Sequence, residues 1–205
     1  MRSTTITIII PVFNVENVVE ETLLSVKNQI SPSDEVIIID DGSTDNSFNI
    51  INGFKNLQGW KIIQTPNQGL GLTRNFGRSI AKSEYIYFLD SDDIIKNDLI
   101  NRMREIIHQY NRPDMILFSG ECFENNQTNN NQTNNNQTNN KKPNLKFTLK
   151  GEYFRGSRLI TKLTKKKETL PQVSRYITKV KLWSKNKLTY PEGIAEDEAV
   201  FFPLL

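Results

Sequence analysis

The stretch Ile6–Val12, ITIIIPV, is a short apolar run dominated by β-branched residues. A continuous apolar run of this length is typical of a strand buried on both faces, as in a parallel sheet. Four similar runs follow at about 35–40, 60–65, 85–89 and 114–119. Amphipathic segments separate them, so the first 120 residues predict an α/β fold with a Rossmann-like, mostly parallel sheet flanked by helices.

Four helices are expected in the connections between these strands. Apolar residues recur at helical spacing at 18–27, around 48–54, at 70–81 and at 99–107. Ser43 or Thr44 would cap the second helix, because short polar side chains accept hydrogen bonds from the first free backbone amides of a helix.

The 205 residues suffice for one sizeable core, and we expect one domain built from two halves. Residues 1–120 form the first half. Residues 125–140 contain only Asn, Gln and Thr, so 121–144 is expected to be a disordered surface loop that buries too little to offset its ordering entropy. Residues 145–205 should add a strand, a helix and an irregular acceptor region to the same sheet. The chain ends soon after an acidic cluster, which leaves a truncated protein as one interpretation.

Charge and hydropathy narrow the range of partners and locations. A net charge of +3 without a clustered basic face does not indicate nucleic-acid binding. No apolar run approaches the roughly 18–20 residues that span a bilayer, and the first residues lack a signal-peptide pattern, so we expect a cytoplasmic protein. The lysines between 162 and 187 are typical of a solvated face. Alternatively they attract anionic lipid or a phosphorylated lipid-linked acceptor, which predicts peripheral association with the inner face of a membrane.

Acidic residues follow two of the predicted strands, at the edge where open α/β sheets bind ligands. Asp40 and Asp41 end the second strand. Adjacent side chains on an extended backbone point to opposite sides, so one carboxylate can accept a hydrogen bond from a base or ribose while the other braces the loop. The alternative is a turn followed by a helix cap.

After the fourth strand, Asp90 and Asp92 are separated by two positions. On an extended backbone, both can face one hard cation and the phosphates that it bridges. The alternative is a helix start, where the dipole favours acidic residues. Between the two acidic motifs, Gly69 and Gly71 allow a close backbone approach to a ligand, and Arg74 suits a pyrophosphate.

Together these motifs resemble those of family 2 glycosyltransferases of the GT-A fold, of the bacterial inverting type. The matching segments are IPVFN at 10–14, DDGSTD at 40–45, NQG at 67–69 with RN at 74–75, and DSDD at 90–93. They keep the family's order and cover about the first half of the chain.

The resemblance implies a role for each matching position in binding a nucleotide sugar. Pro11 and Phe13 would flank the nucleobase. Asp41, with Asp40 beside it, would accept from the base edge. Arg74 would lie near the diphosphate.

The remaining implied roles concern the metal and the base. Asp90 would reach the ribose or the metal, Ser91 would belong to the nucleotide-sugar site, and Asp92 would bind Mn²⁺ or Mg²⁺. The segment 190–198 is similar to the family's general-base region, which assigns the base to Asp197; a plain acidic surface cluster is the alternative. Trp183 is either a packing residue or a platform that stacks on an acceptor sugar.

The implied activity is metal-dependent transfer of a sugar from a nucleotide-diphosphate donor to a hydroxyl of a glycan or lipid-linked acceptor, in cell-surface polysaccharide or lipopolysaccharide assembly. The chain lacks the Gln-x-x-Arg-Trp motif of processive synthases, which favours transfer of one or a few sugars. A haloacid-dehalogenase phosphatase or a receiver domain would need its acidic pair after the first strand, where this chain has PVFN at 11–14. A non-catalytic nucleotide-sugar binding module stays open as the alternative. No motif indicates an oligomeric state.

Overall fold

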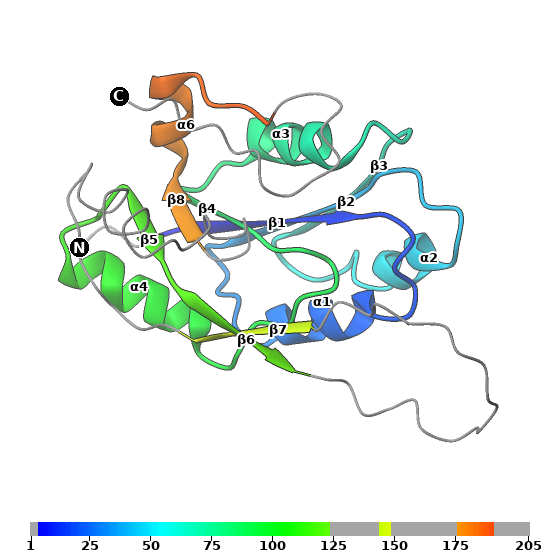
Figure 1. The fold of residues 1–205 in the computed structure, drawn as a ribbon, viewed down its shortest axis with the longest axis horizontal. Helices are drawn as coiled ribbons and strands as arrows, with labels where there is room; N and C mark the ends of the chain where they lie inside the picture. Colours follow the sequence, from blue (N-terminus) through cyan, green and yellow to red (C-terminus); the bar gives the residue numbers. More distant parts are fainter. Residues whose placement is uncertain (1–3, 124–143, 149–175, 191–205) are drawn as a thin grey trace, which may run out of the picture.

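The computed structural model describes residues 4–123, 144–148 and 176–190. A six-stranded sheet with the order β3-β2-β1-β4-β8-β5 lies between two layers of helices (Figure 1). The strands are β1 (Ile6–Val12), β2 (Glu35–Asp40), β3 (Trp60–Gln64), β4 (Tyr85–Phe88), β5 (Met115–Leu117) and β8 (Tyr176–Lys179). The helices are α1 (Val19–Lys27), α2 (Ser47–Asn52), α3 (Leu70–Ile80), α4 (Leu99–Gln109) and α6 (Val180–Asn186). The predicted α/β class with a mostly parallel, helix-flanked sheet is confirmed.

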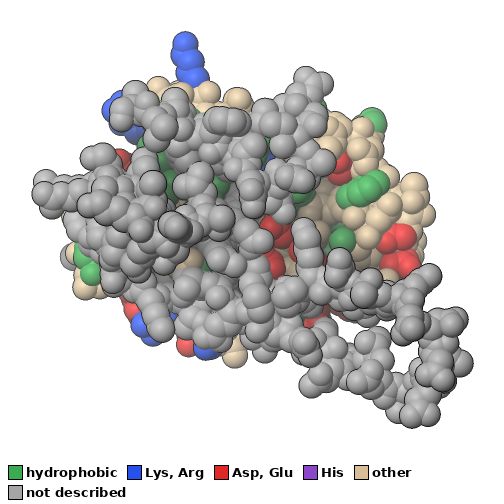
Figure 2. All heavy atoms as spheres, viewed as in Figure 1, with side chains coloured by type: hydrophobic (Ala, Val, Ile, Leu, Met, Phe, Trp, Pro, Cys, Tyr) green, Lys and Arg blue, Asp and Glu red, His purple; other side chains and the backbone are tan. Residues whose placement is uncertain are grey.

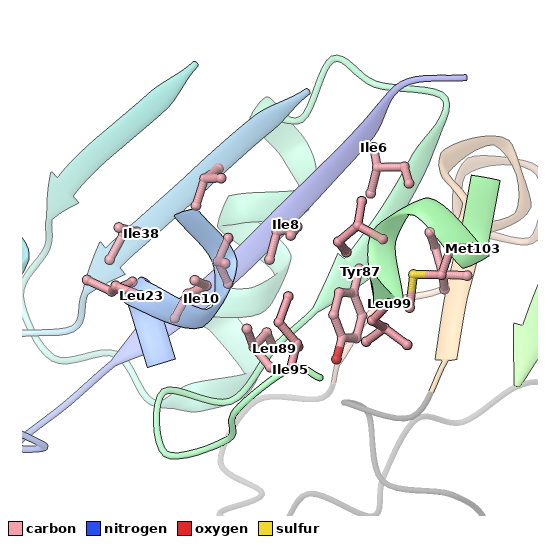
Figure 3. Close-up of a cluster of buried hydrophobic side chains, with 14 of the residues drawn as sticks. Ile6, Ile8, Ile10, Leu23, Ile38, Tyr87, Leu89, Ile95, Leu99 and Met103 are labelled. Atoms are coloured by element: carbon pink, nitrogen blue, oxygen red, sulfur yellow. The ribbon is translucent and has the colours of Figure 1, made fainter. Parts of the chain in front are cut away.

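The central strand β1 is buried along its whole length because helices cover both faces of the sheet. Ile8 and Ile10 point to the face covered by α1, α2 and α4, where they pack with Leu23 and Leu99 (Figure 3). Ile9 points to the opposite face, which is covered by α3 and α6. The continuous apolar run therefore supplies two cores through the alternation of side chains along a strand.

Helix α3 packs unusually close to the sheet at Gly77. A Cβ atom on Gly77 would lie 2.5 Å from Cγ2 of Ile9 and 2.9 Å from Cδ1 of Ile39. Only a residue without a side chain fits this approach. The contact fixes the distance between α3 and the sheet. It thereby also fixes the positions of Arg74 and Asn75, which precede Gly77 by three and two residues.

The pairing of the strands joins the two halves of the sequence in one sheet. β1 pairs in parallel with β2 and β4, and β2 pairs in parallel with β3. β8 lies antiparallel between β4 and β5. The strand and helix expected beyond residue 145 are therefore present as β8 and α6.

The segment predicted as one strand at 114–119 contains two strands. β5 joins the main sheet, whereas β6 (Ser119–Phe123) pairs antiparallel with β7 (Asn144–Thr148) in a separate two-stranded sheet. The loop expected at 121–144 thus overlaps β6 at 121–123 and β7 at Asn144. Residues 124–143, with the Asn/Gln/Thr repeat, lie outside the described residues.

The start of α2 differs from the prediction. The helix begins at Ser47 with Asn46 in the N-cap position, so Ser43 and Thr44 do not cap it. Both instead bond to Asn14, as described below. In the part of the chain that the structure describes, no helix is long and apolar enough to cross a bilayer.

Candidate functional site

The carboxyl ends of β2, β1 and β4 lie next to one another, because β1 is the middle strand of this parallel set. Val12 is the register partner of Asp40, and the Asp41 amide donates to the Val12 carbonyl at 2.8 Å. On the other side, the Leu89 amide donates to the Ile9 carbonyl at 3.0 Å. The sheet therefore brings the motifs at 10–14, 40–45 and 90–93 to one edge, as the sequence predicts.

The two residues expected to flank a base differ in exposure. Pro11 is buried inside β1, in register with Ile39. Phe13 follows the strand, and its side chain is 46% exposed, which is unusual for a large apolar residue. Phe13 is therefore the ring of this pair that is available for stacking.

Asn14 ties the loop after β1 to the loop after β2. Its backbone φ is 50°, in the left-handed region that Asn tolerates better than most residues. Its Oδ1 accepts from the Thr44 amide at 2.8 Å and the Asp45 amide at 3.4 Å, and its own amide donates to Oγ of Ser43 at 3.1 Å. Asn14 has no predicted role of its own, although an Asn directly after a strand is a signal for such a turn.

A second pair of hydrogen bonds joins the same two loops. The Glu16 amide donates to Oδ2 of Asp45 at 3.0 Å, and the Asn46 amide donates to Oε2 of Glu16 at 2.7 Å. Burial alone would raise the pKa of Asp45, but hydrogen bonds from the Ser47 hydroxyl and amide and from the Glu16 amide outweigh it and lower this pKa. The loops around Phe13 are thus held by charge-assisted contacts.

Asp40 and Asp41 both accept hydrogen bonds from neighbouring segments. Asp41 is 3% exposed; its Oδ1 accepts from the Gln68 amide and its Oδ2 from the Gly69 amide, each at 2.9 Å. Asp40 is fully buried, and its Oδ2 accepts from Nε2 of Gln64 at 3.0 Å. In this structure Asp40 links the end of β2 to the end of β3, and Asp41 braces the segment 67–69.

Gly42 allows the segments 40–45 and 65–67 to approach closely. Its φ is 73°, and a Cβ there would lie 2.8 Å from the Asn67 backbone nitrogen. Gly69 also has a positive φ, 89°, but open space around it. Glycine is therefore required at 42 for space and conformation together, and at 69 for conformation alone.

Arg74 is buried next to Asp90. Its side chain is 2% exposed, and its Nη2 lies 2.6 Å from Oδ1 of Asp90, whose side chain is 20% exposed. Its Cζ also lies 5.4 Å from the ring centroid of Tyr190, a cation–π distance. Burial raises the pKa of Tyr190 well above its ordinary value, so this ring is a neutral phenol at physiological pH.

The residues after Asp90 alternate between buried and exposed. Ser91 is 9% exposed, and its carbonyl accepts from Oγ1 of Thr22 at 2.8 Å. Asp92 is exposed, whereas Asp93 is 6% exposed and its amide donates to the Asp90 carbonyl at 3.1 Å. Figure 2, seen from the same side as Figure 1, shows acidic side chains near the middle and at the right of this face, and both acidic and basic ones along its left and lower left edge.

The carboxylates at this site can be compared with the ligands that a divalent cation needs. Within the described ranges, no three His, Cys, Asp or Glu side chains converge as a metal cluster. Mg²⁺, however, is often held by one or two carboxylates together with substrate phosphates and water. The partly exposed Asp90 and the exposed Asp92 fit that mode, in which the nucleotide supplies the remaining ligands.

Trp183 is a packing residue, and the interpretation as a sugar platform is wrong. It is fully buried, and its Nε1 donates to Oγ1 of Thr178 at 2.7 Å. Its ring also meets Phe88 edge to face, with centroids 5.5 Å apart. Asp197, the predicted base, lies outside the described residues.

A comparison with protein families gives a match over most of the chain. The model described as glycosyl transferase family 2 matches residues 7–179. A Haemophilus influenzae protein described as an uncharacterized glycosyltransferase is 42% identical over 111 residues, which are 53% of this chain and 44% of that protein. The poly(ribitol-phosphate) β-N-acetylglucosaminyltransferase TarP of Staphylococcus aureus is 36% identical over 120 residues, 55% of this chain and 35% of that protein.

A solved structure shares the fold over nearly the whole chain. The structure of S. aureus TarS 1–349 in complex with UDP-GlcNAc has a TM-score of 0.68 at 23% identity, and the match covers 97% of this chain and 52% of that one. At this identity the likeness shows the fold alone. The chain spans less than half the length of the curated relatives that it matches.

Proposed function

Because this chain belongs to glycosyl transferase family 2 and has the GT-A fold, we propose that it transfers a sugar from a nucleotide-diphosphate donor to an acceptor hydroxyl. Transfer occurs in one displacement with inversion at the anomeric carbon. The acceptor is a glycan or a lipid-linked glycan of a cell-surface polymer. Relatives that act on poly(ribitol-phosphate), by their names, support this acceptor class.

The observation that carries the proposal is the meeting of Phe13, Asp41 and Asp90 at the carboxyl edge of the sheet. These residues come from three separate segments, and β1 lies between the other two strands. An exposed ring, a carboxylate-braced loop and a partly exposed carboxylate at such an edge suit an aromatic base joined to a sugar phosphate.

Each side chain has a task in holding the donor. Phe13, with its ring open to solvent, stacks on the base. Asp41 holds the 67–69 loop and accepts from the base edge through its remaining lone pairs. Asp90 accepts from the ribose and is oriented by Arg74.

Mn²⁺ or Mg²⁺ is the proposed cofactor, held by Asp92 with Asp90. When bound, the cation would offset negative charge on the departing nucleoside diphosphate. The exposure of Asp92 supports this role, because a ligand that shares a cation with a substrate needs access to solvent.

Asp197 is the proposed general base, and it takes the proton of the acceptor hydroxyl as the oxygen attacks the anomeric carbon from the face opposite the diphosphate. A carboxylate is ionised at neutral pH and therefore suits this task.

We further propose that the protein works in the cytoplasm, at the inner face of a membrane. Lys181, Lys185 and Lys187 are exposed on and just after α6, where they suit anionic headgroups. Cosedimentation with vesicles rich in anionic lipid, compared with neutral vesicles, tests this association.

The activity is tested with a panel of nucleotide sugars, UDP-GlcNAc among them, by measuring nucleoside diphosphate release with and without Mn²⁺. Release that depends on the donor and is lost in Asp197→Ala, with donor binding retained, supports the proposed transferase. Donor binding without release from any donor would instead identify a non-catalytic binding module.

A further inference from the structure

Tyr190 is fastened to α3 by a reciprocal pair of hydrogen bonds. The Asn75 side chain donates from Nδ2 to the Tyr190 carbonyl at 2.8 Å, and its Oδ1 accepts from the Tyr190 amide at 2.9 Å. The two residues are 115 positions apart in the chain. A single side chain thus satisfies both backbone groups of Tyr190.

This pairing needs a carboxamide of the length of Asn. The side chain must present one donor and one acceptor side by side, as a neighbouring strand would. An aspartate in its place offers acceptors only, so its carboxylate would face the Tyr190 carbonyl. An alanine offers neither group.

The contact lies next to the candidate site. Asn75 follows Arg74, whose guanidinium lies over the Tyr190 ring and pairs with Asp90. The Tyr190 ring also meets Phe88 edge to face, with centroids 5.5 Å apart. Tyr190 is 5% exposed, so the segment is anchored at a buried point beside the donor-side carboxylate.

The chain reaches the proposed base Asp197 only seven positions after Tyr190. Seven residues span at most about 25 Å, so the anchor bounds where a base can lie. We infer that Asn75 is a positioning residue, which fixes Tyr190, the residue from which the chain continues to Asp197. This inference rests on the proposed transferase function.

The Asn75–Tyr190 contact should matter for turnover and not for donor binding. The Arg74–Asp90 pair is made by side chains from α3 and from the segment after β4, and neither side chain takes part in the two Asn75–Tyr190 bonds. Loss of these bonds should therefore spare donor affinity and displace the acceptor side. Displacement by about 1 Å can cost on the order of 100-fold in rate.

The test compares Asn75→Asp and Asn75→Ala with the wild type and with the control Asn49→Ala. Asn49 is an exposed carboxamide on α2, and its Nδ2 donates to Oδ1 of Asn46, three positions earlier. Donor affinity is measured by calorimetry, and kcat by nucleoside diphosphate release with water as acceptor. Hydrogen exchange of the peptide containing Tyr190 reports the contact itself, independently of activity.

We expect both Asn75 variants to keep the donor affinity of the wild type, to lose about 100-fold in kcat, and to exchange faster at Tyr190, while Asn49→Ala matches the wild type. Unchanged kcat in Asn75→Asp, or an equal loss of donor affinity and kcat, would overturn the inference and leave the proposed function standing. A wild-type protein that turns over no donor would overturn both.

Discussion

Arg74 and Asp90 form an ion pair in which the cation is buried and the anion reaches the surface. Nη2 of Arg74 lies 2.6 Å from Oδ1 of Asp90, and the side chains are 2% and 20% exposed. Solvent therefore reaches Asp90, whereas Arg74 lies in the interior next to it. The first effect of Arg74 is to orient the carboxylate, because the buried guanidinium holds Oδ1 of Asp90 in one position.

Replacing Arg74 tests this arrangement. Arg74→Met should lower the free energy of unfolding by about 3 kcal/mol, because the change removes one partner of a largely buried pair and leaves Asp90 without its cation. Urea unfolding gives the value. Arg102→Met, an exposed arginine on α4, should stay within about 0.5 kcal/mol of the wild type. A loss in Arg74→Met as small as that of the control would show that the pair is energetically unimportant.

Asp92 should be needed for metal-dependent binding but not for folding. It is exposed, so Asp92→Ala should change the free energy of unfolding by less than about 0.5 kcal/mol. The same change should abolish the gain in donor affinity that Mn²⁺ provides, which calorimetry with and without the ion measures. Glu105→Ala, an exposed acidic residue on α4, should keep the full gain. A retained Mn²⁺ effect in Asp92→Ala would exclude Asp92 as the ligand.

Asn14 contributes both an uncommon backbone conformation and hydrogen bonds, and two variants separate these effects. Asn14→Gly removes the side-chain bonds to the Thr44 and Asp45 amides but accepts a φ of 50°. Asn14→Ala removes the same bonds and adds strain of about 1 kcal/mol. Both variants should bind the donor more weakly than the wild type, and the alanine variant should unfold at the lower urea concentration. Equal stability of the two variants would show that the positive φ costs nothing.

Much of the fold and the site is predictable from the sequence. The buried parallel strands show as apolar runs because both faces of each strand need apolar residues, as Ile8 and Ile9 illustrate. The convergence of Phe13, Asp41 and Asp90 follows from the rule that parallel strands end at a common edge.

Other features depend on contacts between distant segments and could not be predicted. β8 is four residues long, and its insertion between β4 and β5 is decided by tertiary pairing. α2 begins at Ser47, later than predicted, because Thr44 bonds to Asn14, 30 positions away in the chain. Asn75 carries no local pattern that indicates a bond to Tyr190.

Gly77 should be intolerant of even one added carbon. The Cβ of Gly77→Ala would meet Ile9 and Ile39 side chains at 2.5 and 2.9 Å, so α3 or the strands must shift. Overpacking of this kind costs about 1–3 kcal/mol, despite the better helix propensity of alanine. Ser79→Ala on the exposed face of α3 serves as the control. If Gly77→Ala were as stable as the wild type in urea, the close helix–sheet contact would not be a constraint.

Glu35 should make part of the stability depend on pH. It is the first residue of β2, so it lies at the amino ends of the parallel strands, opposite the candidate site. Its side chain is 11% exposed. Burial alone would raise its pKa, but hydrogen bonds from Nζ of Lys61, the Lys82 amide and the Thr7 hydroxyl outweigh burial and lower the pKa below 4.5. A carboxylate whose pKa is lower in the folded than in the unfolded state stabilises the fold above the unfolded value. That contribution disappears as the pH falls through the folded pKa.

The variant Glu35→Gln cannot titrate, so it isolates this contribution from those of other carboxylates. At pH 7 the wild type should be the more stable of the two in urea unfolding. The difference should shrink steadily as the pH is lowered from about 5 toward 3, because only the wild type loses the stabilisation of an ionised Glu35. Donor binding at pH 7 should be the same in both proteins, since Glu35 lies at the opposite edge from Asp90. A stability difference that does not change over this pH range would show that the Glu35 pKa is the same in the folded and unfolded states.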